Sequence, residues 1–147
     1  MHKEFIPYEE ALDIRELGFD EPCIGCYTKL TAEENQGEPV DWIEVSEALI
    51  ENGKYSYGKL KNYNTDFYKS EGTISAPLYQ QVFRWFREEY GLYGTSCPIP
   101  FEDDRFFEYN ISNTHKSVKQ DGVFNSYEEA QDACLKKLIE IVKQKEA

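Results

Sequence analysis

The segment APLYQQVFRWFREEYGL, residues 76–92, constrains the fold more than any other part of the chain. On a helix at 100° per residue, its bulky side chains form one narrow stripe made of Tyr79, Val82, Phe83, Phe86 and Tyr90. Arg84 and Arg87 fall on the opposite side. This separation is typical of a core helix, in which each buried ring contributes about 1.5–3 kcal/mol. We predict a buried helix that begins after Pro77 and ends near Gly91.

The edge of the stripe is where this helix would meet a partner protein. Trp85 lies at that edge and is the aromatic residue that we expect to reach the surface. Trp and Arg are the usual anchors of protein interfaces. If the helix contributes to an interface, the partner-binding residues are predicted to be Arg84, Trp85 and Arg87.

Helical and strand-like patterns alternate in the rest of the chain. Helical spacing recurs in residues 8–17, 41–52 and 127–144, the last behind a Ser126–Glu129 capping box. Strand-like alternation occurs in residues 23–31, 105–112 and 115–120. Because this order gives no repeating βαβ units, the predicted class is α+β. Its small antiparallel sheet would combine these three strands and be covered on one face by helices 77–90 and 127–144.

Turn signals complete this outline. Asn113-Thr114 is expected to turn between the last two strands, and Asp121-Gly122 to close the second of them. Two prolines break CPIPFEDD. The polar, turn-rich segment NYNTDFYKSEGTIS predicts a long loop around residues 61–75. A length of 147 residues is that of one ordinary domain, so a single domain over residues 1–147 is predicted.

The negative charge of the chain is concentrated near its start. Residues 1–51 carry fourteen acidic and three basic residues, within a total net charge of -12. Solubility is the simplest explanation, because a non-specific nucleic-acid binder needs the opposite balance. The alternative is a DNA mimic, which requires one exposed face formed by Glu9, Glu10, Asp13, Glu16, Asp20 and Glu21.

Aromatic and basic residues interleave at Tyr55, Tyr57, Lys59, Lys61, Tyr63 and Lys69. Such a strip is typical of single-stranded nucleic-acid binding, but its modest charge in an acidic chain disfavours a nucleic-acid partner. The opening MHKEFIPYEEAL lacks the apolar run of a secretory signal, and no segment has the eighteen apolar residues of a membrane helix. We therefore expect a cytoplasmic protein with reduced thiols and no membrane partner.

Cys23 and Cys26 form a CxxC pair, which is half of a zinc site. The other possible ligands, Cys97, Cys134, His2 and His115, lack the spacing of the second half. A zinc protein built on Cys23 and Cys26 is thus an alternative. The acidic cluster of residues 102–104 is better explained as a solvated turn than as a metal site. With no phosphate-binding loop and no nucleophile motif, we expect neither catalysis nor a cofactor.

Three long motifs carry a resemblance to a known family. APLYQQVFRWFREEYGL, YEEAQDACLKKLIEIVK and FIPYEEALDIRELGFDEPC resemble a family of small uncharacterised phage and prophage open reading frames, of the staphylococcal phage type. No activity is assigned to that family, so the resemblance implies a phage-encoded protein made in a bacterial host cytoplasm and no functional residues. The leading hypothesis is an accessory protein that binds a host or phage protein without catalysis. Oligomeric state is not indicated by the sequence.

Overall fold

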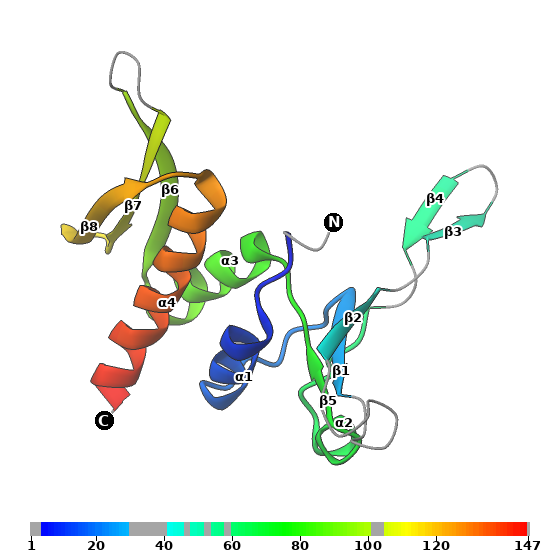
Figure 1. The fold of residues 1–147 in the computed structure, drawn as a ribbon. Helices are drawn as coiled ribbons and strands as arrows, with labels where there is room; N and C mark the ends of the chain where they lie inside the picture. Colours follow the sequence, from blue (N-terminus) through cyan, green and yellow to red (C-terminus); the bar gives the residue numbers. More distant parts are fainter. Residues whose placement is uncertain are drawn as a thin grey trace. The chain divides into compact units, whose positions relative to one another are not determined.

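The computed structural model describes residues 4–29, 41–45, 48–51, 54–57, 60–100 and 105–146. They belong to two compact units, Met1–Leu78 and Tyr79–Ala147 (Figure 1). Each unit contains helices and antiparallel strands, so the predicted α+β class is confirmed. The single domain over residues 1–147 stays a prediction.

The unit Met1–Leu78 is built around an antiparallel sheet with the strand order β2–β1–β5. Its strands are β1 (Gly25–Lys29), β2 (Asp41–Val45) and β5 (Thr73–Ser75). A separate antiparallel pair joins β3 (Ala48–Glu51) and β4 (Lys54–Tyr57). The helices of this unit are α1 (Tyr8–Glu16) and the short α2 (Asp66–Ser70).

The start of the chain is tied into this unit. The Ile6 N–H donates to the Pro77 carbonyl at 3.0 Å, and the Tyr27 hydroxyl donates to the Ile6 carbonyl at 2.6 Å. Ile6 and Ile14 of α1 are fully buried. Helix α1 lies within the helical segment predicted at 8–17, and Gly18 follows it with a left-handed φ of 97°, a conformation that glycine adopts without strain.

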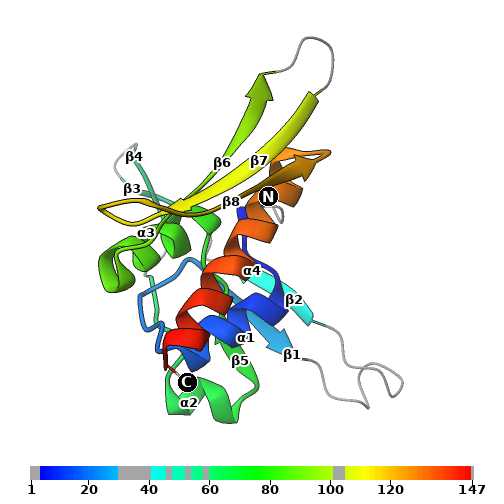
Figure 2. The same ribbon diagram turned by 90° about the vertical axis from the view of Figure 1, so that its left-hand side faces the viewer.

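The unit Tyr79–Ala147 is a three-stranded antiparallel meander with two helices. Its strands are β6 (Tyr93–Pro100), β7 (Arg105–Ser112) and β8 (Ser117–Phe124), and its helices are α3 (Tyr79–Tyr90) and α4 (Tyr127–Glu146). Figure 2 shows the strands side by side, with α4 running across them. Helix α4 contacts all three strands and α3 contacts β6, as expected of a small sheet packed by two longer helices.

Close packing between α4 and the sheet depends on Gly94 of β6. A Cβ at this position would lie 2.9 Å from both Cys134 Sγ and Leu138 Cδ1 on α4. Opposite Gly94 in the strand register stands Ile111 of β7, which is fully buried. The glycine therefore lets the helix approach the sheet directly.

Local capping occurs largely where the sequence predicts it. Asn113 Oδ1 accepts the N–H groups of His115 and Lys116 at 2.8 and 2.9 Å, which confirms the turn before β8. At the start of α4, Ser126 Oγ accepts the Glu129 N–H at 3.1 Å, as in a capping box. Gly122, however, does not close β8, which continues to Phe124. A Cβ on Gly122 would lie 2.6 Å from Glu108 Cβ, so this glycine serves close strand approach.

Four of the five residues of the stripe on α3 are buried as predicted, whereas Tyr90 is half-buried. Phe86 is fully buried, and Tyr79, Val82 and Phe83 are at most 8% exposed, whereas Arg84 is exposed on the other side of the helix. The prediction that Trp85 reaches the surface is wrong, because its side chain is only 4% exposed. Its ring packs edge-on against the rings of Phe86 and Tyr90, at centroid distances of 5.1 and 5.4 Å.

Two predicted elements and the pairing of one predicted strand are wrong. Within the predicted helix 41–52, residues 41–45 and 48–51 form the strands β2 and β3, and β2, which contains Trp42 and Ile43, pairs with β1. The strand predicted at 23–31 is present as β1, but it pairs with β2 and β5 and not with β7 and β8. The segment predicted as a loop at 61–75 contains α2 and β5.

The segment CPIPFEDD also differs from its prediction. Pro98 and Pro100 lie inside β6, which is tolerated because β6 is an edge strand of its sheet and needs no amide hydrogen on its outer side. The opposite edge strand, β8, carries irregularities beside Glu108 and Ser112 of β7. Prolines and bulges both discourage pairing with a further strand.

Candidate functional site

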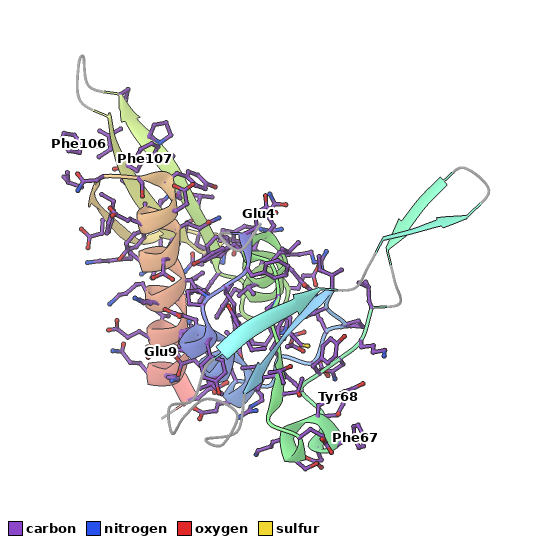
Figure 3. All side chains as sticks on the ribbon, turned by 45° about the vertical axis from the view of Figure 1, so that its right-hand side comes forward. Glu4, Glu9, Phe67, Tyr68, Phe106 and Phe107 are labelled. Carbon is purple, nitrogen blue, oxygen red and sulfur yellow. The ribbon has the colours of Figure 1, made fainter. Side chains whose placement is uncertain are left out.

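The strongest candidate for a binding surface is an aromatic cluster on and before α2. Its three members, Tyr63, Phe67 and Tyr68, are here called the α2 cluster. The ring of Tyr68 packs edge-on against Phe67 and Tyr63, with centroid distances of 5.2 and 5.0 Å. Phe67 is nevertheless 67% exposed, the largest exposed fraction of any large hydrophobic side chain in the described part of the chain. Figure 3 shows Phe67 and Tyr68 together on α2.

The backbone that leads into the α2 cluster is fixed by a polar network. Asn64 Nδ2 donates to the Phe19 carbonyl at 2.9 Å, and Asn64 Oδ1 accepts the Ser75 N–H at 3.0 Å. Ser75 Oγ in turn accepts the Tyr63 N–H at 3.0 Å. Ser75 is fully buried. These three hydrogen bonds tie the start of α2 to β5 and to the residues that follow α1.

Helix α2 is a short helix of five residues. The Lys69 N–H donates to the Thr65 carbonyl at 3.0 Å, and Ser70 Oγ donates to the Phe67 carbonyl at 2.7 Å. Gly72 closes the turn with a left-handed φ of 73°. Hydrogen bonds thus hold the backbone on both sides of Phe67, which lowers the entropic cost of using its ring in an interface.

The charges around the α2 cluster are mixed. Asp66, Lys69 and Glu71 are all exposed beside Phe67 in the sequence, as is Lys61. Lys61 and Tyr63 belong to the predicted aromatic and basic strip. The side chains of residues 55 and 57, and all of Lys59, lie outside the described residues. An apolar ring among charges of both signs has the composition of a protein-binding surface more than of a phosphate-binding one.

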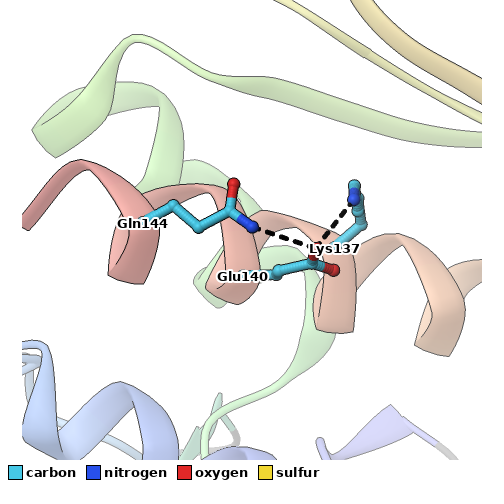
Figure 4. A network of polar contacts seen from close by, with 3 residues as sticks. All are labelled: Lys137, Glu140 and Gln144. Carbon is cyan, nitrogen blue, oxygen red and sulfur yellow. Dashed lines mark hydrogen bonds and ion pairs between the residues drawn. The ribbon is translucent and has the colours of Figure 1, made fainter. Parts of the chain in front are cut away.

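The predicted partner-binding residues of α3 are not brought together at the surface. Arg84 and Arg87 are exposed and Arg84 Nε lies 4.0 Å from Glu88 Oε1, while Trp85 is buried. A similar solvated face occurs on α4, where Lys137 Nζ and Gln144 Nε2 both donate to Glu140 Oε1, at 3.0 and 3.3 Å (Figure 4). Such exposed helical pairs contribute only about 0.2–0.5 kcal/mol each.

The candidate zinc ligands Cys23 and Cys26 are both buried in the unit Met1–Leu78. Cys23 Sγ donates to the Glu21 carbonyl at 3.4 Å. Among the residues described, no three His, Cys, Asp or Glu side chains are grouped closely enough to hold a metal ion. His2 and the acidic cluster at 102–104 lie outside those residues.

The six acidic side chains of the DNA-mimic hypothesis do not form one exposed face. Glu10 is only 4% exposed, and Asp13 and Glu21 are half-buried. Glu9 and Glu16 are exposed and share one side of α1, where seven residues make two turns. This smaller acidic patch is what a solvated helix face ordinarily carries.

The four thiols should differ in reactivity with Ellman's reagent. Cys134 is fully buried, and burial raises its pKa to about 12. Cys97 is half-buried, and burial followed by the nearby Glu108 carboxylate raises its pKa. We expect Cys97 to react first in the native protein, more slowly than free cysteine, and all four thiols to react after denaturation.

The matched variant is Glu108→Gln. Glu108 Oε1 lies 3.7 Å from Cys97 Sγ, so removing the carboxylate charge lowers the pKa of the thiol. The reaction at pH 8 should therefore become faster, because a larger fraction of the thiol is ionised. Equal rates in both proteins would show that the carboxylate does not act on this thiol.

No helix in the described part of the chain has the length and apolar character needed to span a bilayer.

Comparisons with known proteins add no functional assignment. A scan against protein-family models, a search of curated proteins and a search of solved structures found no match to this chain.

Proposed function

We propose that this is a phage-encoded accessory protein that acts in the host cytoplasm by binding another protein, without catalysis. The observation that supports binding most directly is the 67% exposure of Phe67 beside the packed rings of Tyr68 and Tyr63. Clustered aromatic rings at a surface are typical of interaction sites. The resemblance of three sequence motifs to phage open reading frames supports the phage origin.

A protein partner fits the α2 cluster better than a nucleic acid. Single-stranded nucleic acids need an excess of basic side chains next to the stacking rings. Here the exposed lysines 61 and 69 are balanced by Asp66 and Glu71. The ring of Phe67 would instead enter an apolar pocket of the partner, with the surrounding charges forming a polar rim.

Affinity capture from a bacterial host lysate tests this proposal. The bait proteins are the wild-type chain, the variant Phe67→Ser and the control Val118→Ser, which removes another exposed apolar side chain in the other unit. We expect one protein to be retained by the wild type and by the control, and its retention to fall at least about tenfold with Phe67→Ser, as for a hot-spot residue.

Two results would count against the proposal. Equal retention by Phe67→Ser would remove the α2 cluster from the interface. Equal loss of retention with Phe67→Ser and Val118→Ser would indicate that the captured protein binds non-specifically to exposed apolar side chains. Circular dichroism of the three proteins should be the same, because neither substituted side chain is buried.

A further inference from the structure

The sheet of the unit Tyr79–Ala147 extends past the start of α4. The strand register places Pro98 of β6 and Phe124 of β8 on either side of Phe107 in β7. The ring of Phe107 meets the ring of Tyr127, the first residue of α4, edge-on at 6.4 Å. These four residues, Pro98, Phe107, Phe124 and Tyr127, are here called the apolar row.

All members of the apolar row share the face of the sheet on which α4 lies. Phe124 packs against Tyr109, a buried residue of that face, at a centroid distance of 5.9 Å. Ser96, two residues before Pro98, donates its hydroxyl to the Tyr127 carbonyl at 3.2 Å. Because side chains alternate along a strand, Pro98 points to the same side as Ser96.

The apolar row keeps substantial exposure. Tyr127 is 43% exposed, Pro98 is exposed, and Phe107 and Phe124 are half-buried. Residues of the same face further along the strands, such as Tyr109 and Ile111, are buried. The row thus continues the buried face of the sheet past the first residue of α4.

Among the side chains that the structure describes, the charged groups next to Tyr127 are acidic. Glu128 and Glu129, in the first turn of α4, are exposed directly after Tyr127. The basic residues Lys116 and Lys119 lie at the opposite end of β8. An apolar surface with an acidic rim is complementary to a segment that combines apolar and basic side chains.

We propose that the apolar row is a second binding surface, which takes a short basic segment of a partner protein by packing an aliphatic or aromatic side chain of that segment onto Phe107 and Tyr127. Lysine or arginine residues of that segment would face Glu128 and Glu129. This surface belongs to the other unit and does not use the α2 cluster, so it stands independently of the function proposed above.

Selection of random twelve-residue peptides on the immobilised full-length chain tests this surface. We expect enriched peptides with at least two Lys or Arg residues next to an apolar residue. Their binding should fall at least about tenfold with Tyr127→Ser and stay within about twofold with Phe67→Ser.

A charge variant makes the test independent of Tyr127. Glu128→Lys should weaken the same peptides by about threefold at physiological salt and by more at low salt. Glu16→Lys, the same change on an exposed residue of α1, should leave their binding unchanged. Failure to enrich any peptide, enrichment of acidic peptides, or binding that ignores Tyr127→Ser and Glu128→Lys would each overturn the assignment.

Discussion

Replacing Phe86 with alanine is expected to lower the free energy of unfolding by about 3–5 kcal/mol. Phe86 is fully buried in the middle of α3, and its ring contacts the rings of Trp85 and Tyr90. Removing it loses the transfer free energy of the ring and leaves a cavity that rigid neighbours cannot fill. Because small domains have about 5–15 kcal/mol of total stability, this single change can unfold much of the protein.

Urea unfolding followed by far-ultraviolet circular dichroism measures this effect. Arg87→Ala is the control, since Arg87 is the next residue and is exposed, and it should change stability by less than about 0.5 kcal/mol. If Phe86→Ala does not fold, Phe86→Leu should fold with a loss of about 1.5 kcal/mol. A cost below that of the Arg87 control would place the stripe of α3 outside the core.

Replacing Asn64 with alanine is expected to cost about 2–4 kcal/mol, because two backbone groups lose their partners. The Asn64 amide accepts the N–H of buried Ser75 and donates to the carbonyl of Phe19. Both backbone groups are at least partly buried, so water replaces these bonds poorly. The change should also weaken the capture of a partner through Phe67, because Asn64 fixes the backbone that leads into α2.

Thr65→Ala is the matched control for Asn64. Thr65 is the exposed N-cap residue of α2, and its side chain makes no capping hydrogen bond. Its removal should change the unfolding free energy by less than about 0.5 kcal/mol. Hydrogen exchange of the amides in β5 measures the local effect of each variant. Equal exchange rates in Thr65→Ala and Asn64→Ala would contradict a special role for the Asn64 hydrogen bonds.

The longer helices could be predicted from the sequence because their apolar side chains recur at helical spacing and are buried on one face. In α3, rings recur every three to four residues, and only a buried helix satisfies that spacing. Helix α4 adds a Ser126 cap and a cluster of lysines near its end. Strands β7 and β8 were predictable because Asn113 marks their turn.

The errors occur where local pattern and tertiary pairing compete. The segment 41–52 has helical spacing, but its last residue begins the dipeptide Asn52-Gly53, which is a hairpin signal. The register pairs Glu51 with Lys54 on either side of that dipeptide. Whether such a segment becomes a helix or a hairpin depends on the strand it meets, which a single sequence does not reveal.

The candidate site was missed for a different reason. Phe67 lies in a polar, turn-rich segment, which predicts a loop. A single aromatic residue in a predicted loop does not indicate a binding surface. Trp85 was assigned to the surface because it lies at the edge of the α3 stripe, yet neighbouring rings bury it. The exposure of a large side chain is set by what packs around it, and periodicity gives only its direction. The signal that remained available was the spacing of Tyr63 and Phe67, which are four residues apart, with Tyr68 directly after Phe67.

Hydrogen exchange, measured by mass spectrometry with and without the captured partner, tests most directly whether the protein binds through the α2 cluster. Binding through Phe67 predicts that the backbone amides of residues 63–72 become protected in the complex, while the amides of α3 exchange at the same rate as in the free protein. Protection that avoids residues 63–72 and centres on α3 would contradict the account and would move the interface to Arg84 and Arg87.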